Sequence, residues 1–226
     1  MVLLQSTLLV RAGFRHAFPE RGISDSALAA ALELSDASHI ARAKQVHGAN
    51  SLEAFESHVN AEADAIVARA AGGPVAVGVR VADCVPVLVA DEASGDAAAI
   101  HAGWRGLVAG VVHSALEKLR EGLDRRALIA AIGPCIGPCC FEVGDDVADA
   151  IARASDGEVI VRRPGEKTCV DLRAAMHVQL LRHGLVRGQI DDVLGCTKHE
   201  PERFHSFRRD GKESGRMLAA IAARRR

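Results

Sequence analysis

The stretch VAVGVRVADCVPVLVAD, residues 75–91, constrains the fold more than any other part of the sequence. Two valine-rich runs flank a break at Asp83 and Cys84, and Pro86 follows closely. β-Branched apolar runs of this length predict two buried strands, and proline is expected to interrupt the ladder between them. Cys84 is therefore predicted to lie at an interruption between two strands.

Further strands are predicted where short apolar runs end at glycine, and helices where apolar residues recur at helical spacing. Strands are expected within 96–106, 127–134 and 189–197, and helices over 107–122 (with Gly122 as C-cap), 144–155, 170–185 and 213–226. These elements do not alternate regularly. The pattern favours an α+β layered fold over a doubly wound parallel sheet, with one domain over residues 1–226.

Composition excludes several classes of partner. Hydrophobic residues make up 49% and charged residues 25%, and the formal net charge is -1, so no overall field favours nucleic acid or a membrane surface. The apolar N-terminus lacks the features of a signal peptide. A cytoplasmic location is therefore expected, where clustered cysteines suggest metal binding or catalysis rather than disulfides. The terminal arginines, 224–226, are expected to form a solvated helix end.

The stretch GPCIGPCCFEVG, residues 133–144, contains three of the six cysteines. Zinc nucleobase deaminases combine H-x-E with P-C-x-x-C. Here three residues separate Cys135 from Cys139, and none of the ten histidines begins H-x-E. A structural zinc site would need a second pair of ligands. The stretch is therefore interpreted as a shaped loop with small buried thiols. Replacing Cys139 or Cys140 by alanine is expected to leave the zinc content near that of the unmodified protein.

Three dispersed residues form a better candidate metal site. His47 precedes a glycine in KQVHGAN, Cys84 interrupts two strands, and His101 ends a strand in AAIHAGWRG. Two imidazoles and a thiolate suit Zn²⁺, and three protein ligands leave a fourth position for water. Taken alone, each residue also fits a purely structural role.

Two segments could bind an anion. Gly103 and Arg105 open a predicted helix, where free N–H groups and a guanidinium would suit phosphate. A packed turn with Trp104 in the core is the alternative. Arg208 and Arg209, within FHSFRRDGKESGR, could line a cleft for an anionic substrate or form a solvated face.

Five motifs in this order closely resemble the YfiH-type family: QVHG (45–48), ADC-x-PVL (82–88), HAGWRG (101–106), the cysteine-rich stretch, and S-F-RRDG…GR (206–216). These proteins were long labelled laccase-domain or multicopper polyphenol oxidases and are now regarded as purine nucleoside phosphorylases. The resemblance implies a four-layer α-β-β-α sandwich with mixed sheets. It also implies zinc bound by His47, Cys84 and His101, which would form the catalytic centre.

The implied reactions are phosphorolysis of adenosine, inosine and S-methyl-5′-thioadenosine, and deamination of adenosine. Purine nucleosides and phosphate would be the small-molecule partners. Phosphate is expected to contact Gly103 and four arginines: Arg21, which matches an arginine of the family in RHAFPERGIS, with Arg105, Arg208 and Arg209. The carboxylates considered for proton transfer are Asp64, Asp83 and Glu142.

The chain departs from the family pattern in two ways. Its N-terminal part is short, and Phe141 and Phe207 stand where the family usually has tyrosine. Any step that needs a phenol at either position is in question.

Three other functions remain open. Two histidines and a cysteine could bind Cu²⁺, as a polyphenol oxidase requires, although the chain has no H-x-H. Cys84 could be the nucleophile of a cysteine hydrolase, with His101 or His47 as base. A module that senses nucleotides would bind ligand without turnover.

Overall fold

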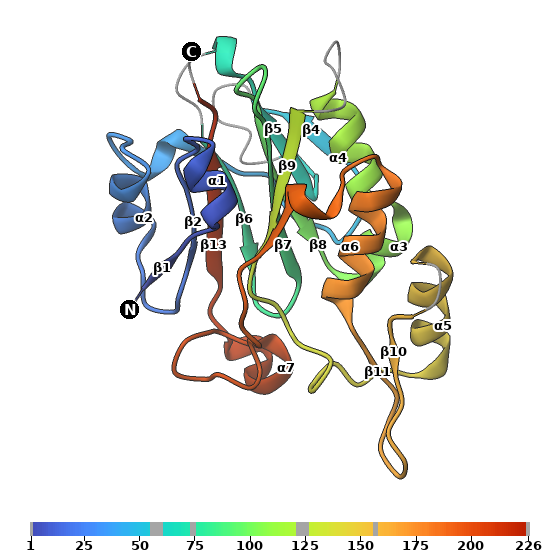
Figure 1. Ribbon diagram of the computed structural model, residues 1–226. Helices are drawn as coiled ribbons and strands as arrows, with labels where there is room; N and C mark the ends of the chain where they lie inside the picture. The colour runs from blue at the N-terminus through green and yellow to red at the C-terminus, as the bar shows by residue number, and fades with distance from the viewer. Residues whose placement is uncertain (1, 55–60, 73–75, 121–126, 156–157, 225–226) are drawn as a thin grey trace.

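A computed structural model describes residues 2–54, 61–72, 76–120, 127–155 and 158–224. Two mixed β-sheets pack face to face, and helices cover both outer faces (Figure 1). The five-stranded sheet has the order β1 (Leu3–Leu4), β2 (His16–Pro19), β13 (Met217–Ala222), β6 (Ala76–Val81), β3 (Ile40–Ala41). The six-stranded sheet has the order β12 (Ile190–Asp192), β9 (Leu128–Ile132), β7 (Val85–Asp91), β8 (Ala97–Ala102), β5 (Ala65–Ala68), β4 (Ser51–Glu53).

The helices differ in the face they cover. α2 (Asp25–Ala31) packs on the five-stranded sheet, whereas α4 (Val111–Leu119) lies across β4, β5 and β8 of the other sheet. The remaining helices are α1 (Thr7–Arg11), α3 (Trp104–Ala109), α5 (Asp145–Ala154), α6 (Leu172–Arg182) and α7 (Phe207–Asp210), and β10 (Ile160–Val161) pairs with β11 (Cys169–Val170). The expected α+β, four-layer arrangement is confirmed.

The layering explains the continuous apolar runs of the sequence. Along β7, Val87 and Val89 pack toward the helices, whereas Leu88 packs into the core between the sheets. All three side chains are fully buried. Because successive side chains point to opposite faces and both faces are covered, every position of such a strand is apolar.

Pro86 lies inside β7, not between the two strands as predicted. The break falls at 82–84, and Pro86 pairs with His101 of β8. On the other side, the amide of Gly133 donates to the Pro86 carbonyl at 2.8 Å, but proline has no N–H to return. The guanidinium of Arg173 donates to the Gly133 carbonyl at 3.0 Å instead, so the missing ladder bond is replaced.

Two predicted helices differ from the structure. The helix expected over 107–122 is divided at Gly110, whose φ of 91° ends α3 and begins α4; Gly122 lies outside the described residues. The helix expected over 213–226 is wrong, because Met217–Ala222 is β13, in the middle of the five-stranded sheet. A short run buried on both faces has no periodicity that separates a strand from a helix.

Arg224 is accordingly not at a helix end. Its guanidinium lies 4.8 Å from the centre of the Phe14 ring and donates to the carbonyls of Ala12 and Glu92. This arginine fastens the end of β13 to the segment after α1.

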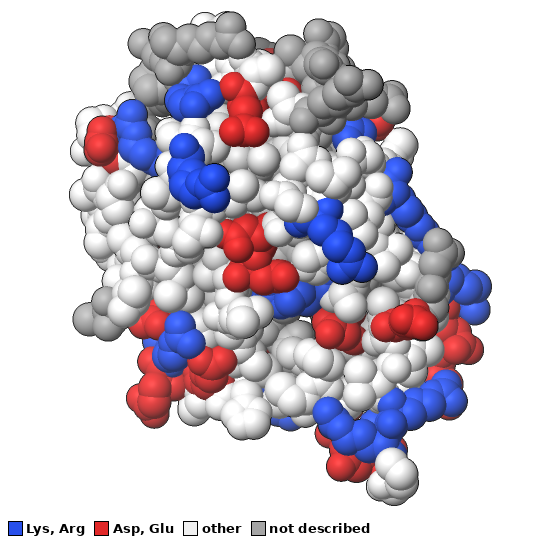
Figure 2. Space-filling view, in the orientation of Figure 1, with Lys and Arg blue, Asp and Glu red and all other residues white. Residues whose placement is uncertain are grey.

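Surface charge is mixed on the face seen in Figure 2, where basic and acidic side chains are interspersed among the described residues. Among these residues, no helix combines the length and the apolar character needed to cross a bilayer.

Gly133 gives a test of the packing between β2 and the loop after β9. A Cβ at this position would lie 2.2 Å from Cδ1 of the buried Phe18 and 2.8 Å from Cγ of Pro86. We expect Gly133→Ala to lower the free energy of unfolding by about 1–3 kcal/mol, the usual cost of overpacking. Gly188→Ala is the matched control, because a Cβ there would have no atom within 4 Å. Urea denaturation of both variants measures the difference, and equal stabilities would contradict the packing described here.

Candidate metal centre and active-site cavity

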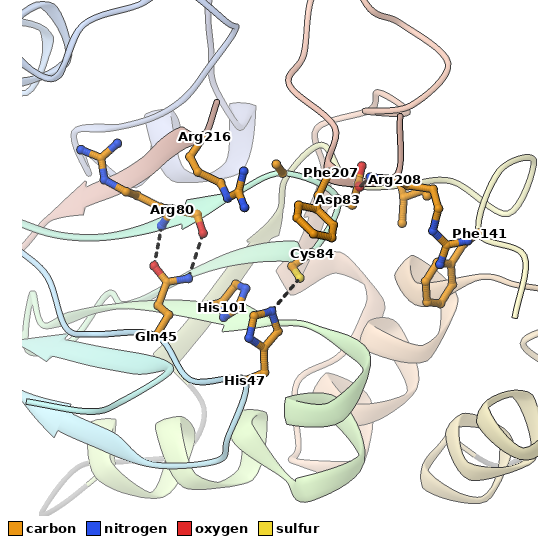
Figure 3. Close-up of a pocket in the computed structure, with 12 residues that line it drawn as sticks. Gln45, His47, Arg80, Asp83, Cys84, His101, Phe141, Phe207, Arg208 and Arg216 are labelled. Atoms are coloured by element: carbon orange, nitrogen blue, oxygen red, sulfur yellow. Dashed lines mark hydrogen bonds between the residues drawn. The ribbon is translucent and has the colours of Figure 1, made fainter. Parts of the chain in front are cut away.

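Three side chains converge where the two sheets open at one end. His47 lies in the loop before β4, Cys84 in the turn between β6 and β7, and His101 near the end of β8 (Figure 3). Cys84 Sγ lies 3.8 Å from His47 Nε2, and one ligand atom from each of the three residues lies within 4.8 Å of the others. The structure therefore brings together the three residues that the sequence singled out as metal ligands.

Asp64 orients two of these three residues. Its carboxylate, fully buried, accepts hydrogen bonds from the successive backbone amides of residues 46–48, at 3.3, 2.9 and 2.7 Å. The same carboxylate lies 2.7 Å from His101 Nδ1. Because Nδ1 is engaged there, Nε2 is the ring nitrogen left to bind a metal. Asp64 is thus a positioning residue, and its buried oxygens do not suit the proton transfer for which it was considered.

Without a metal, Cys84 and His101 form a charged pair. Burial tends to raise the pKa of the Cys84 thiol, but hydrogen bonds with His101 and His47 outweigh it and lower this pKa to about 6. Burial tends to lower the pKa of His101, but hydrogen bonds with Asp64 and Cys84 raise this pKa to about 9. Burial also opposes ionisation of the Asp64 carboxyl group, but hydrogen bonds with His101 and the amide of Gly48 outweigh it and lower its pKa. A thiolate is therefore available near neutral pH.

Gly103 allows the histidine loop to approach the cysteine. A Cβ on Gly103 would lie 2.8 Å from Cδ2 of His47 and 3.0 Å from Sγ of Cys84. His47 itself has a φ of 60°, in the left-handed region. The glycine in HAGWRG is thus required by close packing at the metal centre, a reason independent of anion binding.

Asp83 forms the wall beside Cys84 and is held from several directions. Its φ is 93°, which is strained for a residue with a side chain. Its carboxylate accepts from the hydroxyl of Thr197 and the amide of Arg208, both at 2.6 Å, and its carbonyl accepts from the amide of Ile136 at 2.9 Å. These contacts fix the turn that presents Cys84.

The three candidate ligands open onto a cavity of about 480 Å³. Its wall combines positively charged, aromatic and polar side chains: Gln45, Arg80, Ala82, Asp83, Ile136, Phe141, Phe207, Arg208 and Arg216. The volume is in the range of small-molecule sites. Phe141 and Phe207 both line this cavity, so the two positions expected to differ from the family pattern belong to its wall.

The predicted anion-binding residues separate into two groups. Arg208 lines the cavity, and its guanidinium lies 5.2 Å from the centre of the Phe141 ring. Arg105, Arg21 and Arg209 are not among the lining residues. Arg105 lies over the Trp104 ring at 4.4 Å, and Arg21 donates to the carbonyl of Pro201 at 2.7 Å.

Glu142, one of the carboxylates considered for proton transfer, is also outside the lining of the cavity. Its carboxylate lies 3.7 Å from Lys167 Nζ.

Arg209 has a structural role. Its guanidinium donates to the backbone carbonyls of Thr197, Lys198 and Phe204 and pairs with Asp210 at 2.7 Å. These bonds hold the segment before α7 against the loop after β12.

The sequence did not single out Gln45, Arg80 or Ile136 as parts of the cavity, although QVHG contains the first of them. The Gln45 side chain donates to the Arg80 carbonyl and accepts from its amide, both at 2.8 Å, like one more strand pair on β6. The guanidinium of Arg80 pairs with Asp25. This pairing could not be predicted from the sequence, because Gln45 and Arg80 are 35 residues apart.

The cysteine-rich stretch differs from the expectation of buried thiols. Cys135 is buried, and burial raises its pKa to about 12. Cys139 is exposed and Cys140 is partly exposed, so these two thiols do not act as core hydrophobes. None of the three lines the cavity.

Comparison with known proteins gives the family. Residues 24–224 match the family model described as multi-copper polyphenol oxidoreductase laccase. The chain therefore belongs to this family, the one that the motifs resemble.

Three named relatives are similar over most of the chain. "Adenosine deaminase RL5", from an unknown prokaryotic organism, is 38% identical over 70% of this chain and 61% of its own length. "Purine nucleoside phosphorylase" of Bacteroides thetaiotaomicron is 39% identical over 70% and 60%, so the chain spans about three fifths of either relative. "Purine nucleoside phosphorylase YfiH" of Escherichia coli is 37% identical over 79% and 71%.

Solved structures agree with the fold. YlmD from Geobacillus stearothermophilus superposes with a TM-score of 0.77 at 27% identity, over 94% of this chain and 90% of YlmD. The Bacillus licheniformis protein YfiH gives a TM-score of 0.77 at 26% identity, over 88% and 79%.

The role of Asp64 can be tested by Asp64→Asn. The amide keeps the size of the side chain but loses the charge that His101 and three backbone N–H groups share. We expect Zn²⁺ affinity to fall about 10- to 100-fold, as is typical when a partner that orients a metal ligand is lost. Protection of Cys84 from alkylation, measured by mass spectrometry in chelator-buffered zinc, gives the affinity at this site.

Asp96→Asn is the control for that experiment. Asp96 is similarly buried and pairs with Arg69 at 3.0 Å, but it precedes β8 at the end away from His101. Its replacement is expected to leave the zinc affinity unchanged. Unchanged affinity in Asp64→Asn as well would show that Asp64 does not orient the ligands.

The thiolate of Cys84 gives a second test. In metal-free protein, the rate of Cys84 alkylation by iodoacetamide is expected to rise with pH around a midpoint near 6. The reason is that only the thiolate reacts and its hydrogen bonds form in the folded protein. His101→Ala should move the midpoint up toward the ordinary thiol value of 9.0. A midpoint near 9.0 in the unmodified chain would contradict the charged pair.

Proposed function

We propose that this protein is a zinc-dependent enzyme of purine nucleoside metabolism. It would carry out phosphorolysis of adenosine, inosine and S-methyl-5′-thioadenosine, and deamination of adenosine to inosine. The observation that carries this proposal is the convergence of His47, Cys84 and His101 on one cavity of about 480 Å³ that arginine and phenylalanine also line. The names of the relatives support the same chemistry.

The donor set suits zinc. Two imidazole nitrogens and a thiolate are the ligands that Zn²⁺ takes in proteins, and the low pKa of Cys84, about 6, makes the thiolate available. Held by these three protein ligands, a zinc ion would leave one coordination position for water and would lower the pKa of that water to about 7. Asp64 holds the His101 ring by a bond of 2.7 Å, the support that zinc-binding histidines usually have.

Apolar side chains of the cavity would hold the purine. Phe207 is 49% exposed, and Ile136 and Phe141 add buried apolar surface. Aromatic rings bind planar bases by stacking, which needs no phenol oxygen. Phenylalanine at both positions is therefore compatible with nucleoside binding.

Arg208 and Arg216 are proposed as ligands for phosphate because of their place in the cavity wall. Each also donates to a backbone carbonyl, Arg208 to Glu142 and Arg216 to Ser214, both at 2.7 Å. Both line the cavity, and Arg216 lies 5.5 Å from the centre of the Phe207 ring. Figure 3 shows Arg216 between Arg80 and Phe207, with the guanidinium of Arg80 turned away from the metal centre. We therefore propose Arg208 and Arg216 as the phosphate ligands in place of Arg105, Arg21 and Arg209, which do not line the cavity.

In phosphorolysis, a phosphate oxygen bonds to the ribose C1′ while the bond from C1′ to the purine breaks, and the base takes the electron pair and a proton. In deamination, water adds at C6 of adenine and ammonia leaves. Asp83 is the carboxylate among the lining residues, next to Cys84, and we propose that it exchanges the proton in these steps.

A cysteine hydrolase is the second candidate. Cys84, with a pKa of about 6, lies beside His101, which Asp64 orients, and this order of groups resembles a nucleophile–base–acid triad. The covalent trapping of Cys84 by an acyl substrate, in metal-free protein, would favour it. Copper bound after expression without added copper would favour the polyphenol oxidase that the family description names.

The proposal is tested by incubating the zinc-loaded protein with adenosine, with and without phosphate, and identifying the products. We expect ribose 1-phosphate and adenine only when phosphate is present, and inosine in both cases. Cys84→Ala should lose both activities, since it removes a candidate zinc ligand. Turnover that survives this replacement, or no turnover in the unmodified chain, would contradict the proposal.

Arg216→Ala tests the phosphate position. A charge-assisted hydrogen bond contributes about 1.5–3 kcal/mol, so the apparent phosphate constant should rise roughly ten- to a hundredfold while deamination changes little. Arg105→Ala is the comparison, because Arg105 is exposed and stacks on Trp104 at 4.4 Å. A larger effect of Arg105→Ala would move the phosphate site to the start of α3.

A further inference from the structure

A second group of metal-binding side chains lies outside the cavity. The sulfur of Cys139 lies 3.5 Å from that of Cys140 and 3.6 Å from that of Cys196. Ligand atoms of Cys139, Cys140 and His199 all lie within 4.8 Å of one another. Cys196 is outside this group of three and lies next to it through the sulfur of Cys139. The proposed nucleoside chemistry uses none of these side chains.

The group comes from two short segments of the sequence. Cys196 and His199 form a C-x-x-H pair in CTKH, and Cys139 and Cys140 form the adjacent pair. The cysteine-rich stretch has no second cysteine pair as a partner, because the other pair of ligands consists of Cys196 and His199. The parallel bridge between Cys135 and Cys196 brings the two segments together.

The distances suit one tetrahedral ion. Two sulfurs that each lie 2.3 Å from a tetrahedral zinc are about 3.8 Å apart. The two sulfur separations, 3.5 and 3.6 Å, are close to this value. In addition, the amide of Gly137 donates to Cys196 Sγ at 3.2 Å, the kind of bond that supports a bound thiolate.

We propose that Cys139, Cys140, Cys196 and His199 form a second, structural zinc site. Four protein ligands fill the tetrahedron, so this site has no open position and is not catalytic. His47, Cys84 and His101 supply only three ligands, which is the open arrangement. The two sites thus differ in ligand number as structural and catalytic zinc sites do.

The second site would brace the wall of the cavity. The segment 133–141 supplies the Ile136 amide to the Asp83 carbonyl at 2.9 Å, and the segment after Gly195 supplies the Thr197 hydroxyl to its carboxylate at 2.6 Å. An ion that joins these two segments would hold Asp83 in its strained conformation. The site is at the surface, so zinc could enter without unfolding.

The test is the zinc content of the full chain, purified with reductant from medium with added zinc and measured by elemental mass spectrometry. We expect about two zinc ions per chain, and about one in Cys139→Ala, in His199→Ala and in Cys84→Ala. The loss in Cys139→Ala replaces the expectation from the sequence alone, which was an unchanged zinc content. The double variant Cys84→Ala/Cys139→Ala should retain almost none. Cys135→Ala is the control from the same loop, because its buried thiol is outside the group, and it should keep both ions.

Cobalt substitution tests the second site independently, in the folded protein. Cys84→Ala loaded with Co²⁺ should keep an intense thiolate-to-cobalt absorption, which Cys84→Ala/Cys139→Ala should lose. If the unmodified protein contains one zinc ion per chain and Cys139→Ala still contains one, the second site is overturned. A mass lower by two hydrogens in the reduced-buffer protein, with no cobalt absorption in Cys84→Ala, would show a disulfide in its place.

Discussion

One buried carboxylate determines the geometry of the candidate metal centre. Asp64 is fully inside the protein, where an ionised group is costly unless several hydrogen bonds compensate it. The compensation comes from three successive amides of the loop at 46–48 and from the ring of His101. Satisfying this single charge places His47 and His101 side by side, with ring centres 4.8 Å apart. The convergence of ligands is thus a consequence of burying Asp64.

The third ligand depends on a different constraint. Cys84 follows Asp83, whose φ of 93° costs about 1–3 kcal/mol for a residue of this kind. Contacts from Ile136, Thr197 and Arg208 hold this conformation, and the last two are 114 and 125 residues away in the sequence. The segments that carry Ile136 and Thr197 also carry the second cluster of thiols. The contacts of Asp83 therefore connect the cavity wall, the turn that carries Cys84 and the surface cluster of thiols.

The sequence predicted the parts of this protein that depend on local pattern. The valine-rich strands around Cys84 and the strand ending at His101 were predicted because both faces of each strand are buried. β13 was mistaken for a helix because a short alanine-rich buried run has no distinctive period. The roles of Asp64, Arg216 and His199 depend on contacts between distant segments, which spacing alone does not encode. Motif resemblance supplied the ligand set, but not the carboxylate that orients it.

The proposed chemistry depends most directly on zinc bound by His47, Cys84 and His101. Crystals of the zinc-loaded protein, measured on both sides of the zinc absorption edge, test it. We predict an anomalous peak about 2.0–2.1 Å from the two imidazole nitrogens and about 2.3 Å from the Cys84 sulfur. An anomalous map with no peak among these three residues, in crystals that contain zinc elsewhere, would contradict the account.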